Sequence, residues 1–226
     1  MKGTLFIVGT PIGNLRDITF RAVDTLREVQ CIACEDTRVT GKLLHAYDIH
    51  TPSISLHEHT SSEKLQHIIQ EIEAGKNIAY TCDAGTPGMN DPGGKLVQAA
   101  HEAGIRVIPI PGASALTSLI SVCGFPMDDF IYAGFVPHKK GRKTFFEKIS
   151  TIKEPVIFLE STHRIEKCLD ELVAILEPTR LICIGRELTK MHETVYRGIA
   201  RDVQKAIGAT SSRGEFTLVV GPRPKG

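Results

Sequence analysis

The sequence predicts an α/β protein of two domains, the first with a mainly parallel sheet and the second with a mixed sheet. In the first half, short β-branched runs alternate with amphipathic stretches of helical period, a pattern typical of parallel strands joined by helices. After Cys123-Gly124-Phe125-Pro126 the predicted strands follow one another more closely, which favours a mixed sheet. A length of 226 residues suits two compact domains at about 100–200 residues each.

Strands and helices of the first half follow from this alternation. Thr60-Ser61-Ser62-Glu63 is a capping box that opens a helix, and Gly75 ends it. A second helix, Lys95–Ala103, ends in the same way at Gly104. The expected strands are Leu5–Val8, Cys31–Cys34, Ser53–Leu56, Ile78–Cys82 and Val107–Ile110.

The second half begins after a Gly/Pro turn, so we place the domains at residues 1–124 and 125–226. A helix rich in Lys and Phe is expected over about Arg142–Lys153. A second helix carries Ile165, Cys168, Leu169, Leu172 and Leu176 on one face. The expected strands are Val156–Leu159, Leu181–Ile184, Glu193–Ile199 and Thr217–Val220.

Composition indicates an ordinary globular chain, with 42% hydrophobic and 23% charged residues. No apolar run approaches the roughly 18 residues that a membrane span needs. Met1-Lys2-Gly3 leads straight into a short apolar run without a signal-peptide cleavage site. We therefore expect a cytoplasmic protein that does not associate with membranes.

Charge is divided unequally along the chain although the net charge is only +1. Residues 1–124 carry 10 Lys/Arg against 13 Asp/Glu, and residues 125–226 carry 17 against 13. The densest basic run contains Lys139, Lys140, Arg142 and Lys143. Such a run attracts polyanions such as RNA, although a solvated loop and helix face gives the same pattern.

The six cysteines do not form a recognisable metal site. Cys31-Ile32-Ala33-Cys34 is a CxxC pair, but no second pair or histidine cluster completes a zinc site. The pair also lies in an apolar run that reads as a buried strand. We expect structural thiols and no bound metal.

Three loops rich in Gly and Pro each follow a strand of the first half. They are Gly9–Asn14, Asp83–Gly94 and Pro111–Ala115. Taken singly, each is an ordinary turn, but three such loops at neighbouring strand ends line one ligand site. They lack the G-x-G-x-x-G and P-loop patterns and offer backbone amides, hydroxyls and little positive charge. This suits an adenosine-bearing sulfonium ligand better than a polyphosphate.

Seven blocks of the chain resemble one family in their order. The sequence is similar to the ribosomal small-subunit methyltransferase I family, 16S rRNA (cytidine-2′-O)-methyltransferases within the tetrapyrrole methylase superfamily (class III methyltransferases). Its Met89-Asn90 and Val136 depart slightly from the usual family residues, and many members continue further after their second domain. The first of the seven blocks combines Val8–Leu15, Asp17–Thr19 and Glu35–Arg38, and the others are Asp83–Gly93, Pro111–Ala115, Gly134–Pro137, Glu160–Arg164, Arg186–Lys190 and Gly214–Phe216.

The resemblance implies two α/β domains of the tetrapyrrole methylase type, S-adenosyl-L-methionine held in the cleft between them, and a homodimer. It implies cofactor binding by Pro11, Asp83, Ala84, Gly85, Pro87, Gly88, Ser114 and Ala115 from the first domain, and by Phe158, Glu160, Arg186, Phe216 and Thr217 from the second.

A proton acceptor or a cation beside the ribose hydroxyl would assist methyl transfer. Candidates in the resembling blocks are Glu35, Asp36, Arg38, Glu160, Arg164, Glu187 and Lys190, together with Glu193. Two structural alternatives stay open. Glu35–Arg38 precedes a helix, so one of its residues is equally suited to an N-terminal cap. Glu160 and Glu187 are equally suited to pairing with Arg164 and Arg186.

The sequence thus indicates a 2′-O-methyltransferase that acts on a decoding-centre cytidine of 16S rRNA, as free rRNA or within the small ribosomal subunit, with Lys139, Lys140, Arg142 and Lys143 binding RNA. Methylation of a tetrapyrrole by the same fold is one alternative. A non-catalytic RNA-binding assembly module is another.

Overall fold

Two five-stranded sheets organise the computed structural model, which describes residues 1–57, 60–89, 91 and 93–224. Asn90 and Pro92 of the second Gly/Pro loop lie outside the described residues. The chain divides into two compact units, Met1–Ser114 and Ala115–Gly226. Within the described residues, none of the helices is both long and apolar enough to cross a membrane.

The first unit is a parallel sheet in the strand order β3-β2-β4-β1-β5. At its centre Phe6 of β1 pairs with Ala79 of β4 and Ile108 of β5. The parallel arrangement predicted from the alternation of strands and helices is confirmed. The strands are β1 (Thr4–Val8), β2 (Cys31–Cys34), β3 (Ser53–Ser55), β4 (Ile78–Thr81) and β5 (Arg106–Ile110), and the helices are η1 (Leu15–Asp17), α1 (Phe20–Glu28), α2 (Thr37–Ala46), α3 (Ser62–Glu73) and α4 (Gly93–Glu102).

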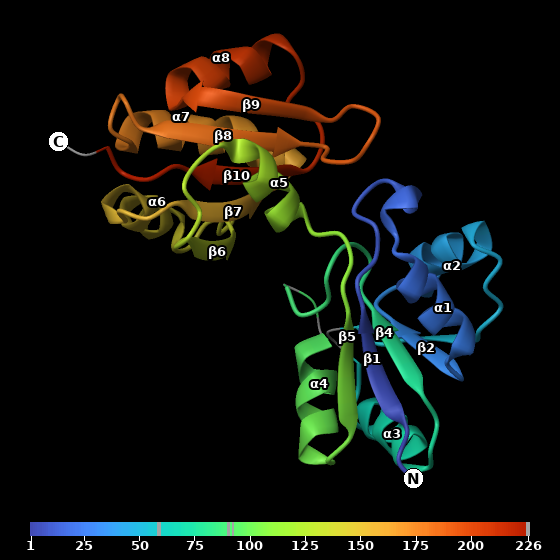
Figure 1. Cartoon of the computed structure of the whole chain (residues 1–226). Helices are drawn as coiled ribbons and strands as arrows, with labels where there is room; N and C mark the ends of the chain where they lie inside the picture. Colours follow the sequence, from blue (N-terminus) through green and yellow to red (C-terminus); the bar gives the residue numbers. More distant parts are fainter. Residues whose placement is uncertain (58–59, 90, 92, 225–226) are drawn as a thin grey trace. The chain divides into compact units, whose positions relative to one another are not determined.

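Helices cover both faces of this sheet, α1 and α2 on one and α3 and α4 on the other (Figure 1). Alternate strand residues supply the two cores, since Leu5 packs with Ile68 and Leu96 whereas Val8 packs on the opposite face. The cap of α3 differs from the expected one. Ser61 accepts the Lys64 N–H at 3.4 Å, and Thr60 instead accepts the N–H of His57 at 2.8 Å, so the helix begins one residue later than the capping box predicts.

The second unit is a mixed sheet in the order β6-β7-β10-β8-β9, with β6 parallel to β7 and the other neighbours antiparallel. This confirms the mixed sheet expected for the second half. At its centre Leu218 of β10 pairs with Phe158 and Ile184. The strands are β6 (Ile131–Phe135), β7 (Val156–Glu160), β8 (Leu181–Arg186), β9 (Thr194–Ile199) and β10 (Phe216–Val220), and the helices are α5 (Ala115–Cys123), α6 (Arg142–Thr151), η2 (Thr162–Arg164), α7 (Ile165–Ile175) and α8 (Ala200–Ala209).

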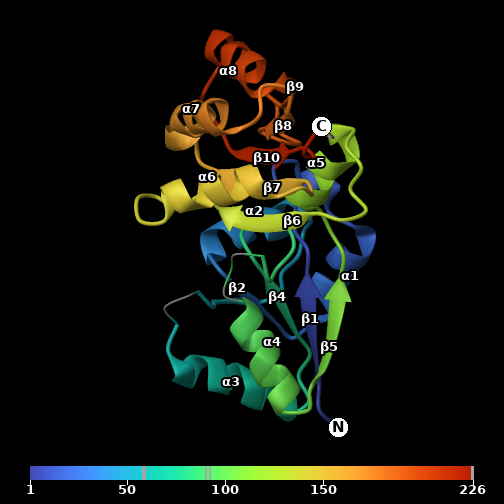
Figure 2. The same cartoon turned by 90° about the vertical axis from the view of Figure 1, so that its left-hand side faces the viewer.

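Helix α5 explains why the chain divides earlier than the expected boundary after residue 124. Figure 2 shows α5 on one side of the second sheet, with α6 and α7 on the other. Leu119 and Cys123 of α5 are buried, and the helix packs on β8 and β10. It therefore belongs to the second unit, although the Gly/Pro turn that marks a boundary in the sequence comes after it.

Candidate active site

The three Gly/Pro loops lie side by side at one edge of the first sheet. They follow β4, β1 and β5, which are neighbours in the sheet, and the carboxyl ends of parallel strands meet at the same edge. Thr10 and Gly85 exchange backbone hydrogen bonds of 2.9 and 3.2 Å, and Thr86 Oγ1 donates to Ala113 O at 3.2 Å. The loops therefore form one continuous surface, as their positions in the sequence predict.

Two glycines allow the first and third loops to touch. A Cβ on Gly9 would lie 2.8 Å from the Gly112 backbone, and a Cβ on Gly112 would lie 2.6 Å from Gly9 O. Real Cβ atoms do not approach backbone this closely, so a side chain at either position would push the loops apart.

The second loop is held in shape by a residue that the sequence analysis missed. Asp91 accepts the N–H groups of Gly88 at 2.5 Å and Met89 at 3.0 Å with one carboxylate oxygen, and that of Gly93 at 2.8 Å with the other. Gly85 and Gly88 adopt positive φ of 86° and 95°, which glycine tolerates. Within the described residues, a Cβ on Gly88 would meet nothing within 4 Å, so the Cα of Gly88 is open to a ligand while its N–H is held by Asp91. An Asp that precedes a Gly/Pro run often accepts hydrogen bonds from the backbone of a turn, so the sequence could have indicated this role of Asp91.

Two carboxylates stand where β2 and β4 end, beside these loops. Asp83 Oδ1 accepts the Asp36 N–H at 3.0 Å, and Glu35 Oε2 accepts the Asp83 N–H at 3.4 Å. Partial burial raises the pKa of both carboxyl groups, and the neighbouring carboxylates add to the rise. The structure thus brings Glu35 and Asp83 together, although they are far apart in the sequence.

Asp36 and Arg38 have structural partners. The Asp36 carboxylate caps α2 by accepting the Arg38 N–H at 2.8 Å and pairs with the Arg38 guanidinium at 2.6 Å. Hydrogen bonds from Arg38 lower the pKa of Asp36 to about 2. Of the alternatives left open, the N-terminal cap therefore describes Asp36.

A buried ion-pair network occupies the end of β7 in the second unit. Glu160, whose side chain is fully buried, pairs with Arg142 at 2.9 Å and with Arg164 at 2.7 Å. Arg142 also pairs with Glu171 at 2.8 Å and donates to Pro137 O at 3.3 Å. The pairing of Glu160 with Arg164, considered as an alternative to catalysis, is present.

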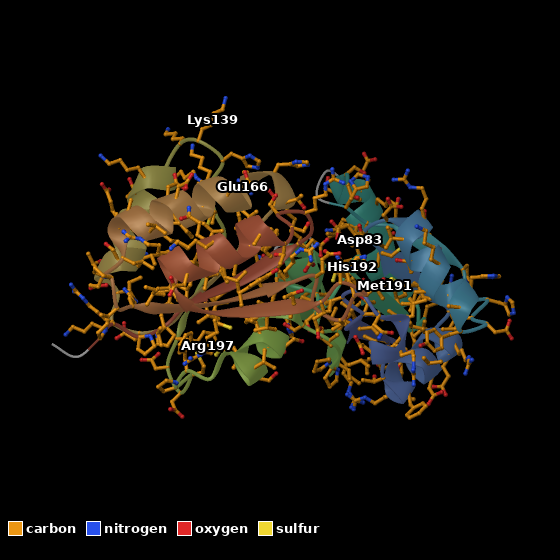
Figure 3. The ribbon with its side chains drawn as sticks, turned by 90° about the horizontal axis from the view of Figure 1, so that it is seen from above. Asp83, Lys139, Glu166, Met191, His192 and Arg197 are labelled. Carbon is orange, nitrogen blue, oxygen red and sulfur yellow. The ribbon has the colours of Figure 1, made fainter. Side chains whose placement is uncertain are left out.

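This network corrects the prediction that Arg142 binds RNA. Only 4% of the Arg142 side chain is exposed, and its guanidinium faces inward to two carboxylates, so it cannot contact a phosphate. Lys139, Lys140 and Lys143 are exposed, and Lys139 projects outward from the loop before α6 (Figure 3). The basic run therefore presents three cations to solvent, and the fourth stabilises the fold.

The predicted cofactor residues of the second unit gather at one end of its sheet. Phe216 of β10 pairs with Glu160 of β7 and with Arg186 of β8. The side chains of Phe158, Phe216 and Thr217 are buried within the unit, so only their backbone groups remain for a ligand. Arg186 donates to the carbonyls of Arg213 at 2.6 Å and His192 at 3.3 Å rather than pairing with Glu187. Their part in cofactor binding stays a prediction.

Glu187 and Lys190 brace the turn between β8 and β9, which ends in the exposed Met191 and His192 (Figure 3). Glu187 Oε1 accepts from Lys190 Nζ at 3.0 Å and from the Glu215 N–H at 2.8 Å, and Lys190 also pairs with Glu215 at 3.0 Å. Glu187 has a positive φ of 51°, which is uncommon outside glycine. These contacts hold a strained turn, and they occupy both side chains that the sequence put forward for catalysis.

In the described part of the chain, no three His, Cys, Asp or Glu side chains are grouped so that they could bind a metal ion. The six cysteines are free thiols. Cys34 of the CxxC pair is buried in β2.

Comparison with known proteins places the chain in a family. A profile of the tetrapyrrole (corrin/porphyrin) methylases matches residues 4–204. Ribosomal RNA small subunit methyltransferase I of Escherichia coli O157:H7 is 43% identical over 222 residues, which cover 97% of this chain and 78% of that protein. The protein of the same name from Bacillus subtilis (strain 168) is 44% identical over 219 residues, covering 96% of this chain and 75% of that protein. This chain belongs to the ribosomal RNA small subunit methyltransferase I family.

Solved structures with the same fold are more distant than these relatives of the ribosomal RNA small subunit methyltransferase I family. Diphthine synthase aligns with a TM-score of 0.74 at 14% identity, covering 97% of this chain and 90% of that one. Uroporphyrin-III-C-methyltransferase from Thermus thermophilus aligns with a TM-score of 0.67 at 17% identity, covering 97% and 94%. At these identities the likeness shows the tetrapyrrole methylase fold and nothing of the substrate.

As a member of the ribosomal RNA small subunit methyltransferase I family, the chain is a methyltransferase whose cofactor is S-adenosyl-L-methionine. The loops of the first unit fit this cofactor. They offer the open space at the Gly88 Cα and the Asp83 carboxylate, which favours a nearby sulfonium and can accept hydrogen bonds from ribose or amine. The part of the predicted residues in binding it stays a prediction; they are Pro11, Asp83, Ala84, Gly85, Pro87, Gly88, Ser114 and Ala115.

Proposed function

We propose that this chain methylates the 2′-hydroxyl of a cytidine in the decoding centre of 16S rRNA. The observation that carries the proposal is membership of the ribosomal RNA small subunit methyltransferase I family over nearly the whole chain. The chain is an S-adenosylmethionine-dependent rRNA methyltransferase on that ground. The more specific part of the proposal, namely which nucleotide and which ribose oxygen are methylated, rests on the resemblance of the seven sequence blocks.

When bound, S-adenosylmethionine supplies a methyl group on a sulfonium, which is already a good leaving group. The protein therefore contributes mainly by aligning the ribose oxygen and by handling its proton. The three loops of the first unit are stiffened by their mutual backbone contacts and by Asp91. They can therefore hold a ligand with little reorganisation.

RNA contact is supported by the second half of the chain, which carries 17 Lys/Arg against 13 Asp/Glu. We propose that Lys139, Lys140 and Lys143 contact phosphates. All three are exposed before or at the start of α6, where positive charge is unfavourable for the helix dipole. The helix dipole does not explain them, whereas phosphate contact does.

Mass spectrometry of 16S rRNA tests the target. Cells that lack the gene should lose one 2′-O-methylcytidine in the decoding centre, and complementation with this chain should restore it. A restored methyl group on a base, or on a nucleotide elsewhere, would overturn the proposal. Incubation of the protein with free 16S rRNA and with small subunits shows which of the two it accepts.

A salt titration tests the basic segment. Replacing Lys139, Lys140 and Lys143 with Ala should weaken rRNA binding and reduce the slope of log affinity against log salt by about 0.7–0.9 for each phosphate that the variant no longer neutralises. A matched control replaces Lys42, Lys95 and Lys205, three cations from elsewhere on the chain, with Ala. An unaltered slope in the first variant would remove the segment from the interface and favour a small-molecule substrate such as a tetrapyrrole.

We also propose that the protein works as a homodimer in the cytoplasm, as the resemblance implies. Sedimentation equilibrium at micromolar concentration should give twice the mass of 24.7 kDa. A monomer at that concentration would contradict this.

A further inference from the structure

The structure separates the candidates for the proton acceptor by what each side chain already binds. Asp36 caps α2 and pairs with Arg38, and Glu187 pairs with Lys190. Glu160 is fully buried between two arginines. Among the residues that the structure describes, no Lys or Arg side chain lies within ion-pair distance of Glu35. Glu193 likewise has no cation partner in the described part of the chain, but its Oε2 accepts the Thr189 N–H at 2.5 Å within the turn between β8 and β9. Glu35 is thus the candidate carboxylate of the first unit whose basicity is not neutralised by a bound cation.

We propose that Glu35 is the catalytic base, which takes the proton of the ribose hydroxyl during methyl transfer. The proposal rests on the proposed function and deepens it by naming the residue that the sequence left undecided. It stands on the position of Glu35, on its hydrogen bonds and on the groups around it.

The position of Glu35 joins two elements of the candidate site. It follows β2, next to β4, and its N–H donates to Thr81 O at 3.3 Å. Its carboxylate accepts the Asp83 N–H at 3.4 Å, and the Asp83 carboxylate accepts the N–H of Asp36 at 3.0 Å. Each carboxylate is therefore held by the backbone of the other strand's loop. This double link fixes Glu35 beside the loop that carries Asp83. A ribose hydroxyl brought to a cofactor in that loop would then have a proton acceptor within reach.

One oxygen of the carboxylate remains for a substrate. Glu35 Oε2 accepts the Asp83 N–H, whereas Oε1 has no hydrogen bond from the described residues. The side chain is only partly buried, so a ribose hydroxyl can reach it. In this arrangement Asp83 contacts the cofactor and Glu35 contacts the ribose hydroxyl, so each carboxylate acts on one of the two reactants.

Partial burial and the surrounding charges make Glu35 a stronger base than an ordinary glutamate. Partial burial raises the pKa of its carboxyl group, and the carboxylates of Asp83, Asp91 and Asp36 raise it further, while the Asp83 N–H acts in the opposite direction. Among the described residues, Tyr80 of β4 and Cys82, which follows β4, also interact with Glu35, and both stay neutral because burial raises their pKa, that of Cys82 to about 12. Arg38 on α2 is engaged by Asp36. A base with a raised pKa accepts a proton more readily near neutral pH.

The step balances without any further reactant. The ribose oxygen forms a bond to the methyl carbon, and the carbon–sulfur bond breaks with its electron pair left on sulfur. The hydroxyl proton passes to a Glu35 carboxylate oxygen and then to water. Nothing is oxidised or reduced, and no metal is required.

Glu35→Gln tests the proposal because glutamine keeps an oxygen that can accept the Asp83 N–H but cannot take up a proton. We expect the single-turnover rate at saturating rRNA and cofactor to fall by about 10²–10⁴-fold, the usual contribution of a general base. Affinity for S-adenosylmethionine by calorimetry and for rRNA by filter binding should stay within about two-fold. Glu28→Gln, an exposed glutamate at the end of α1, is the matched control and should change neither.

Two further measurements do not depend on the size of that fall. The wild-type rate should rise with pH through the pKa of Glu35 and then level, because the base acts when deprotonated, and this limb should be absent in Glu35→Gln. In the cofactor-free protein, a carbon-detected NMR titration of the Glu35 carboxyl should show a midpoint above that of an ordinary glutamate. Asp83→Asn should lower this midpoint, because it removes a neighbouring negative charge.

Three outcomes overturn the proposal. The first is a Glu35→Gln rate within about three-fold of wild type, and the second is a loss explained entirely by weaker binding of cofactor or rRNA. The third is a Glu35 titration midpoint at or below that of an ordinary glutamate. If the wild-type protein methylates rRNA while Glu35→Gln does so equally well, the base is wrong and the proposed function stands. If the wild-type protein transfers no methyl group to rRNA, both fail.

Discussion

The substitution Arg142→Met tests whether the Arg142 guanidinium, in the middle of the basic run, stabilises the fold or binds RNA. The substitution keeps a side chain of similar length and removes the charge between Glu160 and Glu171, which lie 2.9 and 2.8 Å from the guanidinium. It also removes the contact of the guanidinium with the face of the Phe146 ring, 5.3 Å from its centroid. Two carboxylates, one of them fully buried, are then left without this cation.

Removing one partner of a buried ion pair costs about 3–5 kcal/mol. Glu160 keeps Arg164 at 2.7 Å and the Ser161 N–H at 2.7 Å, and Glu171 is partly exposed, so we expect the lower end, about 3 kcal/mol. The control is Lys143→Met at the next residue. The Lys143 side chain is 89% exposed and lies 3.7 Å from Glu147, and loss of such a surface pair costs less than about 0.5 kcal/mol.

Hydrogen exchange followed by mass spectrometry on peptides from α6 and α7 measures the free energy of opening within the second unit. Exchange should be much faster in Arg142→Met and nearly unchanged in Lys143→Met. Filter binding to rRNA should show the reverse order of effect at equal amounts of folded protein. Unchanged exchange in Arg142→Met, together with weakened rRNA binding, would refute the structural role and return Arg142 to the interface.

The remaining predictions concern the first unit. Gly112→Ala should destabilise it by about 1–3 kcal/mol in urea unfolding, because the new Cβ would lie 2.6 Å from Gly9 O; no change would mean that the loops separate without strain. Asp83→Ala should weaken cofactor binding about ten-fold or more in calorimetry, because it removes a hydrogen bond to a charged group. Equal affinity in the variant would leave Asp83 only its contact with Asp36. In the wild-type protein, a chelator should not change cofactor binding. Iodoacetamide at pH 8 should label Cys31 before Cys82, because Cys82 is buried and its pKa is raised to about 12; mass spectrometry of the native protein gives the order, and faster labelling of Cys82 would show that the loop opens.

Local patterns predicted most of the fold. The strand Cys31–Cys34 was placed correctly to the residue, because a short apolar run that ends at charged residues has few other interpretations. The meeting of the three Gly/Pro loops also followed from position alone, since each comes after a strand of a parallel sheet.

The roles of individual site residues depend on long-range contacts, which the sequence could not predict. Arg142 reads as one of four cations in a run, and its carboxylate partners stand 18 and 29 residues further along the chain. The link between Glu35 and Asp83 spans 48 residues. Such pairs leave no local spacing to recognise, so candidate residues for catalysis could be gathered from the sequence but not separated.

Helix α5 has a consequence for any attempt to produce the first unit as a separate fragment. A fragment that stops at the Gly/Pro turn after residue 124 carries α5 without β8 and β10, and so exposes the apolar side chain of Leu119 to water. A fragment that stops at Ser114 avoids this but cuts the loop Pro111–Ala115 before its last residue. Truncation would therefore create either an aggregation-prone helix or an incomplete cofactor loop, and substitution within the whole chain is the cleaner way to dissect this enzyme.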